Sequence, residues 1–197
     1  MHSTDTMKRK ILLPEQPGNH SPSRRRFMRN ALGATASLAA PSGWASLARN
    51  PEHSLAFLNL HTGESLKTTF RADGALIDQE LTAINQLLRD HRSGEIYRMD
   101  PLLLDALYLL QQSVDVDGPF HIISGYRSPR TNAKLHASSN GVAKRSLHMQ
   151  GKAVDIRLPG CKLKDLRNAA LALKAGGVGY YPGSDFIHVD TGRVRRW

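Results

Sequence analysis

The order of short strand-like and helix-like segments limits the fold that residues 51–197 can adopt. The segment 54–70, SLAFLNLHTGESLKTTF, alternates apolar and polar residues around Gly63, which predicts a β-hairpin. Further short strands are predicted in four segments, PFHIISGYRS (119–128), KAVDIRL (152–158), VGYYP (178–182) and FIHVDTG (186–192). None of them is long enough to dominate a sheet alone.

Helical segments precede and interrupt these strands. The strongest is MDPLLLDALYLLQQSV (99–114), in which Asp100 can cap the helix and Pro101 fits its first turn. Three others are predicted, at 76–92, 130–138 and 162–177. Because helices do not alternate regularly with strands, the order favours an α+β fold over a doubly wound parallel sheet. We expect a small antiparallel sheet with helices packed on one side.

The single cysteine, Cys161, excludes some chemistry at the outset. One thiol cannot build an intramolecular disulfide framework or a zinc site of several cysteines. Any metal ion must therefore be held by His, Asp or Glu. Cys161 itself is predicted to be a passive residue at a helix start, with a reactive thiol beside Lys162 and Lys164 as the alternative.

The first 48 residues are predicted to be an export signal, and residues 49–197 a single domain. SRRRFMRN (23–30) is followed by a short alanine-rich apolar run and by small residues fit for cleavage at Ala45 or Ala48. The paired arginines are similar to a bacterial twin-arginine signal, which would place the mature protein in the periplasm. The run is too short for a membrane span, so no stable membrane insertion is expected after signal removal. The alternative is a disordered basic tail.

The net charge of +10 raises the question of a nucleic-acid partner. Residues 1–48 hold seven Lys/Arg and two Asp/Glu, so half of the excess lies in the predicted signal. No basic stretch is interleaved with aromatic residues. A nucleic-acid partner is therefore not expected, and a polyanionic matrix suits the charge equally well.

The segment SLHMQGKAVDI (146–156) and the segment DFIHVD (185–190) carry the residues with catalytic potential. Gly151 would let a loop bearing His148 fold back over a strand face that carries Asp155. His188 lies in a second strand within an apolar run. Two histidines and one carboxylate are a sufficient ligand set for catalytic zinc with an open position for water. On spacing alone, the alternative of a loop-capping His148 and an interior, hydrogen-bonded His188 is equally acceptable.

Several of these residues match the motifs of a known protein family. The pattern S-x-H-x-x-G-x-A-x-D is complete and resembles the signature of the M15 family of zinc peptidases, which includes D-Ala-D-Ala carboxypeptidases, dipeptidases and phage endolysins. The residues that match are Ser146, His148, Gly151, Ala153 and Asp155. SGYRSPRTNAKL, AGGVGYYPGSDFIHVDTG and the final RRW are more closely similar to its YcbK-like, or DUF882, branch. Together these motifs span most of residues 51–197.

The resemblance implies a hedgehog/D-Ala-D-Ala peptidase-like fold and a role for each matching residue. His148, Asp155 and His188 would bind Zn²⁺, and Arg127 would face the substrate carbonyl or the developing oxyanion. A structural ion pair with a buried carboxylate is the alternative for Arg127. Asp185, three residues before His188, would be the general base, although a regular strand would turn it away from the face of His188. Asp190 is the alternative base, or a partner that orients a ligand.

The same resemblance implies an exported zinc endopeptidase that hydrolyses cross-links between peptidoglycan stem peptides. Activity as a D,D-carboxypeptidase or L-Ala-D-Glu peptidase is an alternative specificity. A non-catalytic peptidoglycan-binding module with the same fold is an alternative of another class, favoured by the unsettled base. The sequence predicts neither the oligomeric state nor the bond that is cut.

Overall fold

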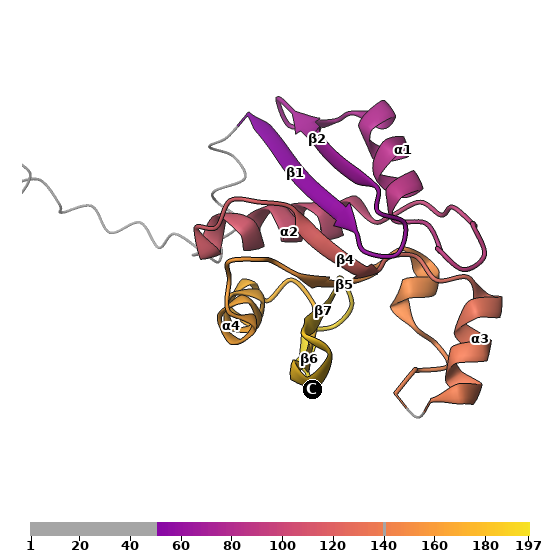
Figure 1. Cartoon of the computed structure of the whole chain (residues 1–197). Helices are drawn as coiled ribbons and strands as arrows, with labels where there is room; N and C mark the ends of the chain where they lie inside the picture. Colours follow the sequence, from indigo (N-terminus) through magenta and orange to yellow (C-terminus); the bar gives the residue numbers. More distant parts are fainter. Residues whose placement is uncertain (1–50, 140) are drawn as a thin grey trace, which may run out of the picture. The chain divides into compact units, whose positions relative to one another are not determined.

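The computed structural model describes residues 51–139 and 141–197, which form one eight-stranded sheet with four α-helices (Figure 1). The strand order across the sheet is β3-β2-β1-β4-β5-β7-β6-β8. The strands are β1 (Glu52–Asn59), β2 (Ser65–Ala72), β3 (Ala75–Leu76), β4 (Phe120–Ser124), β5 (Ala153–Arg157), β6 (Gly177–Tyr181), β7 (Phe186–Asp190) and β8 (Arg195–Arg196). The helices are α1 (Asp78–Leu87), α2 (Pro101–Val114), α3 (Pro129–Ser138) and α4 (Leu163–Leu173), with short 3₁₀ turns η2 (Leu147–Gln150) and η3 (Pro182–Ser184).

The sheet is mixed, which corrects the expectation of a small antiparallel one. β1 pairs with β4 in parallel, and β6 pairs with β8 in parallel. The other neighbours are antiparallel. A parallel neighbour requires a long crossover, and the chain between β1 and β4 supplies one through β2, β3, α1 and α2. The α+β class is confirmed, but the sheet is larger and less regular than expected.

The predicted hairpin and the predicted central helix are both present. β1 and β2 are antiparallel, and Gly63 takes a φ of 72° in the turn between them. Asp100 caps α2 by accepting a hydrogen bond from the backbone N–H of Leu102, with Pro101 in the first turn. Residues 103–110 are all buried. A helix that is buried all round lies in the centre of the core.

The alternation of β5 and β7 separates the hydrophobic core from a polar face. Val154, Ile156, Ile187 and Val189 are buried in the core cluster, together with side chains of α1, α2 and α4. Their alternate neighbours on these strands point to the opposite face, because successive side chains of a strand alternate. That opposite face carries the residues singled out by the sequence.

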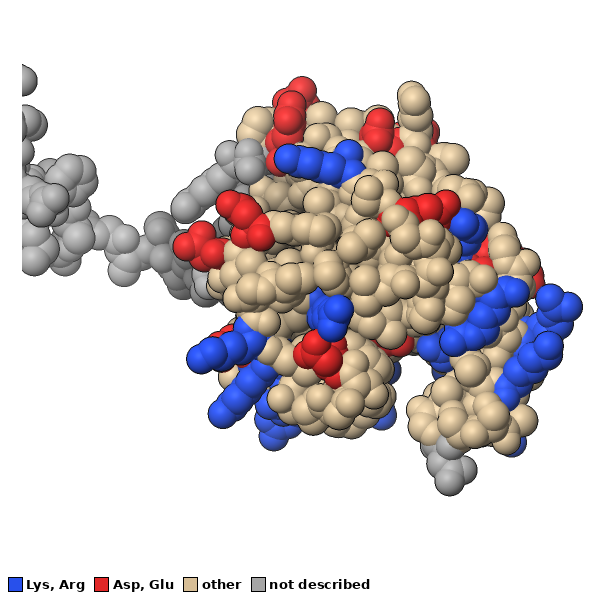
Figure 2. Space-filling model, in the orientation of Figure 1, with Lys and Arg blue, Asp and Glu red and all other residues tan. Residues whose placement is uncertain are grey.

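The excess of positive charge does not form one continuous surface on the face shown in Figure 2. Lys and Arg lie in separate groups around α3 and α4, and Asp and Glu are scattered over the β1–β2 hairpin, α1, the left end of α2 and the region of α4. The absence of a nucleic-acid partner stays a prediction. No helix within residues 51–139 and 141–197 is both long and apolar enough to cross a bilayer.

The predicted export signal and the predicted domain boundary at residue 49 lie outside the described residues. The domain itself is described from residue 51 onward.

Gly151 ends the 3₁₀ turn that carries His148, and its position tolerates no side chain. Its φ is 65°, in the left-handed region. Its carbonyl accepts a hydrogen bond from the N–H of Asp100. A Cβ on Gly151 would overlap the backbone carbonyl of Arg98. The close approach at Gly151 is therefore to the segment before α2, and not to the strand face of Asp155 over which the sequence predicted that it would let the loop fold.

We expect Gly151→Ala to destabilise the protein, because a left-handed φ costs a non-glycine residue roughly 1–2 kcal/mol and the overlap with Arg98 adds to that cost. Urea denaturation should show a loss of at least about 2 kcal/mol in the free energy of unfolding. Gly183→Ala is the matched control, because a Cβ there meets open space and its φ is not positive. Equal stability of the two variants would contradict this account.

Candidate metal centre

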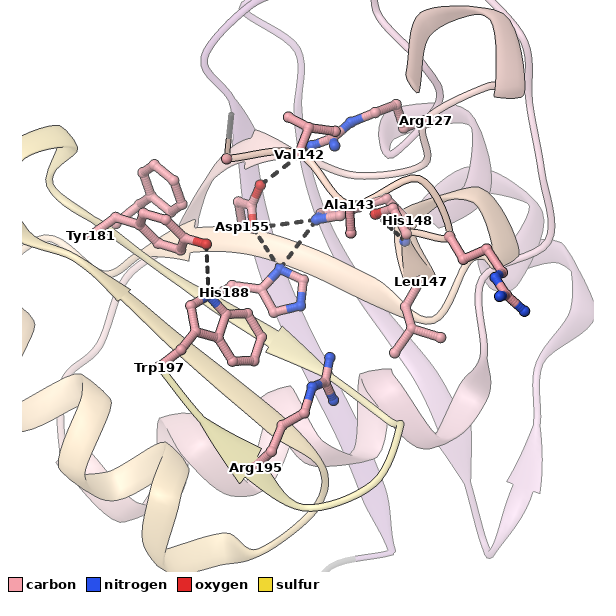
Figure 3. Close-up of a pocket in the computed structure, with 14 residues that line it drawn as sticks. Arg127, Val142, Ala143, Leu147, His148, Asp155, Tyr181, His188, Arg195 and Trp197 are labelled. Atoms are coloured by element: carbon pink, nitrogen blue, oxygen red, sulfur yellow. Dashed lines mark hydrogen bonds and ion pairs between the residues drawn. The ribbon is translucent and has the colours of Figure 1, made fainter. Parts of the chain in front are cut away.

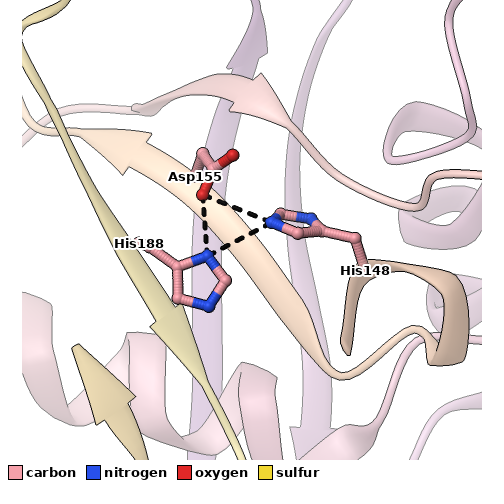
Figure 4. Close-up of side chains that lie close together, drawn as sticks. All are labelled: His148, Asp155 and His188. Carbon is pink, nitrogen blue, oxygen red and sulfur yellow. Dashed lines mark hydrogen bonds and ion pairs between the residues drawn. The ribbon is translucent and has the colours of Figure 1, made fainter. Parts of the chain in front are cut away.

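Three side chains from different elements converge on one point of the polar face (Figure 4). His148 comes from η2, Asp155 from β5 and His188 from β7. Asp155 and His188 are directly opposite one another in the antiparallel pair, where side chains on the same face are close. Asp155 Oδ1 lies 2.9 Å from His188 Nδ1 and 3.3 Å from His148 Nε2, and the two ring nitrogens are 3.2 Å apart.

Hydrogen bonds on the far side of each imidazole fix which nitrogen faces the cluster. The backbone carbonyl of Gly125 lies 2.8 Å from His148 Nδ1. A carbonyl can only accept, so Nδ1 carries the proton and Nε2 presents a lone pair. In the same way, Asp190 Oδ2 lies 3.0 Å from His188 Nε2, which leaves Nδ1 directed at Asp155.

The surroundings of Asp155 and Asp190 favour the ionised form of both carboxylates. Burial would raise the pKa of Asp155, but the charges and hydrogen bonds of His148 and His188 outweigh it and hold that pKa well below its usual range. Burial likewise opposes ionisation of Asp190. Hydrogen bonds from His188, Arg195 and the backbone hold the pKa of Asp190 well below its usual range.

The donor set fits a metal ion. One carboxylate oxygen and two imidazole nitrogens lie within 4.8 Å of one another, close enough to share one ion. Burial lowers the pKa of His188, but hydrogen bonds to Asp155 and Asp190 outweigh burial and raise it. A divalent ion bound here would displace protons from its ligands. Nitrogen and oxygen ligands from three residues leave a coordination position open, as in catalytic metal sites.

Arg127 lies beside the cluster, and its predicted role toward the substrate stays a prediction. It follows β4, and its guanidinium Nη2 is 3.7 Å from Asp155 Oδ2, the oxygen that does not face the histidines. Ser124 Oγ accepts a hydrogen bond of 3.3 Å from the same nitrogen. Arg127 Nε is buried and has no hydrogen-bond partner among the described residues. The guanidinium is thus fixed, and part of its donor capacity is unused.

Asp185 and Asp190, the two candidates for the general base, have different surroundings. Asp185 takes a φ of 53° just before β7 begins, so it is free of the strand alternation that would turn it away. Its side chain is 63% exposed and its carboxylate is 2.9 Å from Arg157 Nη1. Arg157 lies two residues after Asp155 and so on the same face of β5. Asp185 therefore lies on the site's side of the sheet, outside the residues that line the pocket.

The side chain of Asp190 is completely buried, and both of its oxygens are engaged. Besides His188, it accepts hydrogen bonds from the N–H groups of Gly177 and Gly192 and from the guanidinium of Arg195. An anion held in this way orients a ligand, and it has no access to a substrate proton.

The cluster lies in a pocket of about 480 Å³ (Figure 3). The loop 141–147 forms one side, and Ser146 in it accepts a hydrogen bond from the N–H of His148. Tyr181, Phe186, Arg195 and Trp197 form the other side. Sequence reasoning assigned no role to Tyr181 or Trp197. The only signal was the presence of both within motifs of the resemblance, VGYYP and the final RRW.

The family model and the similar proteins found by comparison carry the same name. The family model for peptidoglycan L,D-endopeptidase MepK matches residues 47–197. The chain is 47% identical over 167 residues to the peptidoglycan L,D-endopeptidase MepK of Escherichia coli strain K12, covering 85% of this chain and 91% of that protein. It is 42% identical over 144 residues to the probable peptidoglycan L,D-endopeptidase MepK of Haemophilus influenzae, covering 73% of this chain and 77% of that protein.

Replacing either histidine of the cluster should abolish metal retention. We expect His148→Ala and His188→Ala to lose the bound ion on dialysis, because two remaining ligands cannot hold it against water. Elemental analysis of the dialysed, folded proteins is the measurement, with circular dichroism to check folding. His61→Ala is the control, since this exposed histidine lies outside the cluster and should keep the ion. Full metal content in either cluster variant would contradict the assignment.

Proposed function

The chain belongs to the MepK family of M15 peptidases, and from this we propose that it is a zinc-dependent peptidoglycan L,D-endopeptidase whose metal ligands are His148, Asp155 and His188. One observation supports the proposal most strongly. The imidazoles of His148 and His188, each held in one tautomer by a hydrogen bond, meet the carboxylate of Asp155 in a pocket that Arg127 also lines.

Zinc bound to these residues would supply a Lewis acid that polarises the scissile carbonyl and a bound water with a pKa of about 7. The chain's own residues hold the ligands in place. Gly125 and Asp190 fix the imidazoles, and Arg195 fixes Asp190. Little reorganisation is then needed when the substrate binds, which is the basis of electrostatic catalysis.

Arg127 supplies a fixed positive charge beside the reacting carbonyl. Its guanidinium is anchored by Asp155 and Ser124, and its Nε has no partner among the residues described. A cation held at this place stabilises negative charge that develops on the carbonyl oxygen in the transition state. The ion pair with Asp155 therefore serves both to position Arg127 and to orient the metal ligand.

Asp185 is the proposed general base. Its carboxylate is exposed, on the site's side of the sheet, and held by Arg157, whereas the oxygens of Asp190 are already engaged. A base must accept a proton from water and pass it to the leaving amine. In this structure only Asp185 of the two has a carboxylate that solvent reaches.

The proposed substrate is the peptide cross-link between stem peptides of peptidoglycan, and the L,D bond specificity follows the name of the relatives, peptidoglycan L,D-endopeptidase. Peptidoglycan lies outside the cytoplasmic membrane, so an enzyme of this function must be exported. The basic, apolar and small residues in order within residues 1–48 supply a twin-arginine-type signal for export to the periplasm.

Cleavage of purified cross-linked muropeptides tests the metal requirement. We expect the protein to release monomers from L,D-cross-linked dimers, to lose this activity on treatment with a chelator, and to regain it with zinc, because the ligands alone cannot activate water. Chromatography of the products is the measurement. Binding without cleavage in the presence of zinc would favour the non-catalytic module, and cleavage of D,D- but not L,D-linked substrates would overturn the bond assignment.

Asp185→Asn tests the base. The amide cannot accept a proton, so we expect kcat to fall about 10²- to 10⁴-fold while the zinc content is unchanged. Asp190→Asn is the contrasting variant, because it should weaken zinc binding about 10- to 100-fold through the orientation of His188. If Asp185→Asn turns over at the wild-type rate, Asp185 is not the base.

A further inference from the structure

The C-terminal residue Trp197 is fixed at the edge of the sheet next to the metal centre. Its backbone N–H donates to the carbonyl of Val178, and its carbonyl accepts from the N–H of Tyr180. These bonds continue the parallel pairing of β6 with β8. The indole is therefore positioned by the sheet itself, and it forms part of the pocket wall (Figure 3).

The indole ring is packed on several sides. Gly179 offers it space, since a Cβ there would lie 2.8 Å from the indole Cε2. The guanidinium of Arg195 lies 4.8 Å from the ring centroid, and the His188 ring lies 5.2 Å from it. Trp197 thus occupies one orientation, in which its Nε1 points along the pocket wall toward Tyr181.

The hydrogen bond between these two aromatic residues determines where the Tyr181 proton can go. Trp197 Nε1 lies 2.7 Å from the Tyr181 hydroxyl oxygen. An indole N–H can only donate, so the Tyr181 oxygen accepts and its own O–H must be directed elsewhere. Among residues 51–139 and 141–197 the Trp197 bond is the one hydrogen bond found for this hydroxyl, which lies at an exposed position. Tyr181 lines the pocket, where substrate would be the nearest new partner.

The tyrosine ring itself has little freedom. Tyr181 stacks on Phe186, with ring centroids 4.6 Å apart and an interplanar angle of 19°. Stacking fixes the plane of the ring, and the bond from Trp197 fixes the acceptor side of its hydroxyl. A donor prepared in this way loses little entropy on binding a ligand.

We propose that the Tyr181 hydroxyl donates a hydrogen bond to an oxygen of the bound peptide at the metal centre, and that Trp197 positions that hydroxyl. The inference rests on the proposed endopeptidase function and adds a second donor opposite Arg127. Tyr181 is the group that contacts the substrate, and Trp197 acts only through it. Trp197, the last residue of the RRW motif, then has a role in the reaction, which is to position Tyr181.

A double-mutant cycle with Tyr181→Phe and Trp197→Phe tests both parts of the inference. We expect Tyr181→Phe to lower kcat/KM on L,D-linked muropeptide dimers about 10- to 100-fold, with unchanged zinc content and melting temperature. Trp197→Phe keeps an aromatic ring but no N–H, and should lower kcat/KM less. Because Trp197 acts through Tyr181, the double variant should be no less active than Tyr181→Phe alone.

Tyr180→Phe is the matched control. Tyr180 neighbours Tyr181 but packs beneath Arg167, outside the pocket lining, so its hydroxyl should not affect cleavage. Wild-type kcat/KM in Tyr181→Phe would overturn the inference while leaving the endopeptidase function intact. Independent, multiplicative losses in the double variant would overturn the positioning role of Trp197. A wild-type protein that cleaves no muropeptide would instead overturn the proposed function on which both depend.

Discussion

The two hydrogen bonds that hold the imidazoles from behind are the interactions on which the site depends. The Gly125 carbonyl and the Asp190 carboxylate each accept from one ring nitrogen and so direct the other toward Asp155. Neither acceptor belongs to the cluster itself. Asp190 in turn accepts hydrogen bonds from the backbone N–H groups of Gly177 and Gly192 and from Arg195. This one carboxylate at the end of β7 therefore also contacts the start of β6 and β8. The edge of the sheet and the His148, Asp155 and His188 cluster are therefore one structural unit.

Such an anion is stable only because each of its lone pairs is used. A buried carboxylate without partners would be protonated, and His188 would then lose the negatively charged acceptor that favours a proton on its Nε2. The same strands also build the core, since Ile187 and Val189 belong to the core cluster while His188 lines the pocket and Asp190 lies buried behind it. Alternation along five residues of β7 thus supplies hydrophobic stabilisation and ligand geometry together.

The sequence predicted the parts of this structure that depend on local pattern. The hairpin around Gly63, the cap at Asp100 and the strand faces of Asp155 and His188 follow from turn, capping and alternation rules, and all are present. The spacing of His148, Asp155 and His188 in the sequence fits a shared metal site and separate structural roles equally well. Only the resemblance to M15 peptidases favours the shared site. The structure brings the three side chains together. It also resolves the orientation of Asp185, because β7 begins after it.

The features that the sequence did not predict depend on contacts between distant segments. The parallel pairings of β1 with β4 and of β6 with β8 join segments with no shared periodicity, and β8 has only two residues. The bond from Trp197 to Tyr181 depends on that last pairing.

The most direct test of the account is X-ray absorption at the zinc edge of the zinc-loaded protein. It should show two imidazole nitrogens with oxygen ligands at roughly 2.0–2.2 Å. A sulfur ligand or a single imidazole would contradict a centre built from His148, Asp155 and His188.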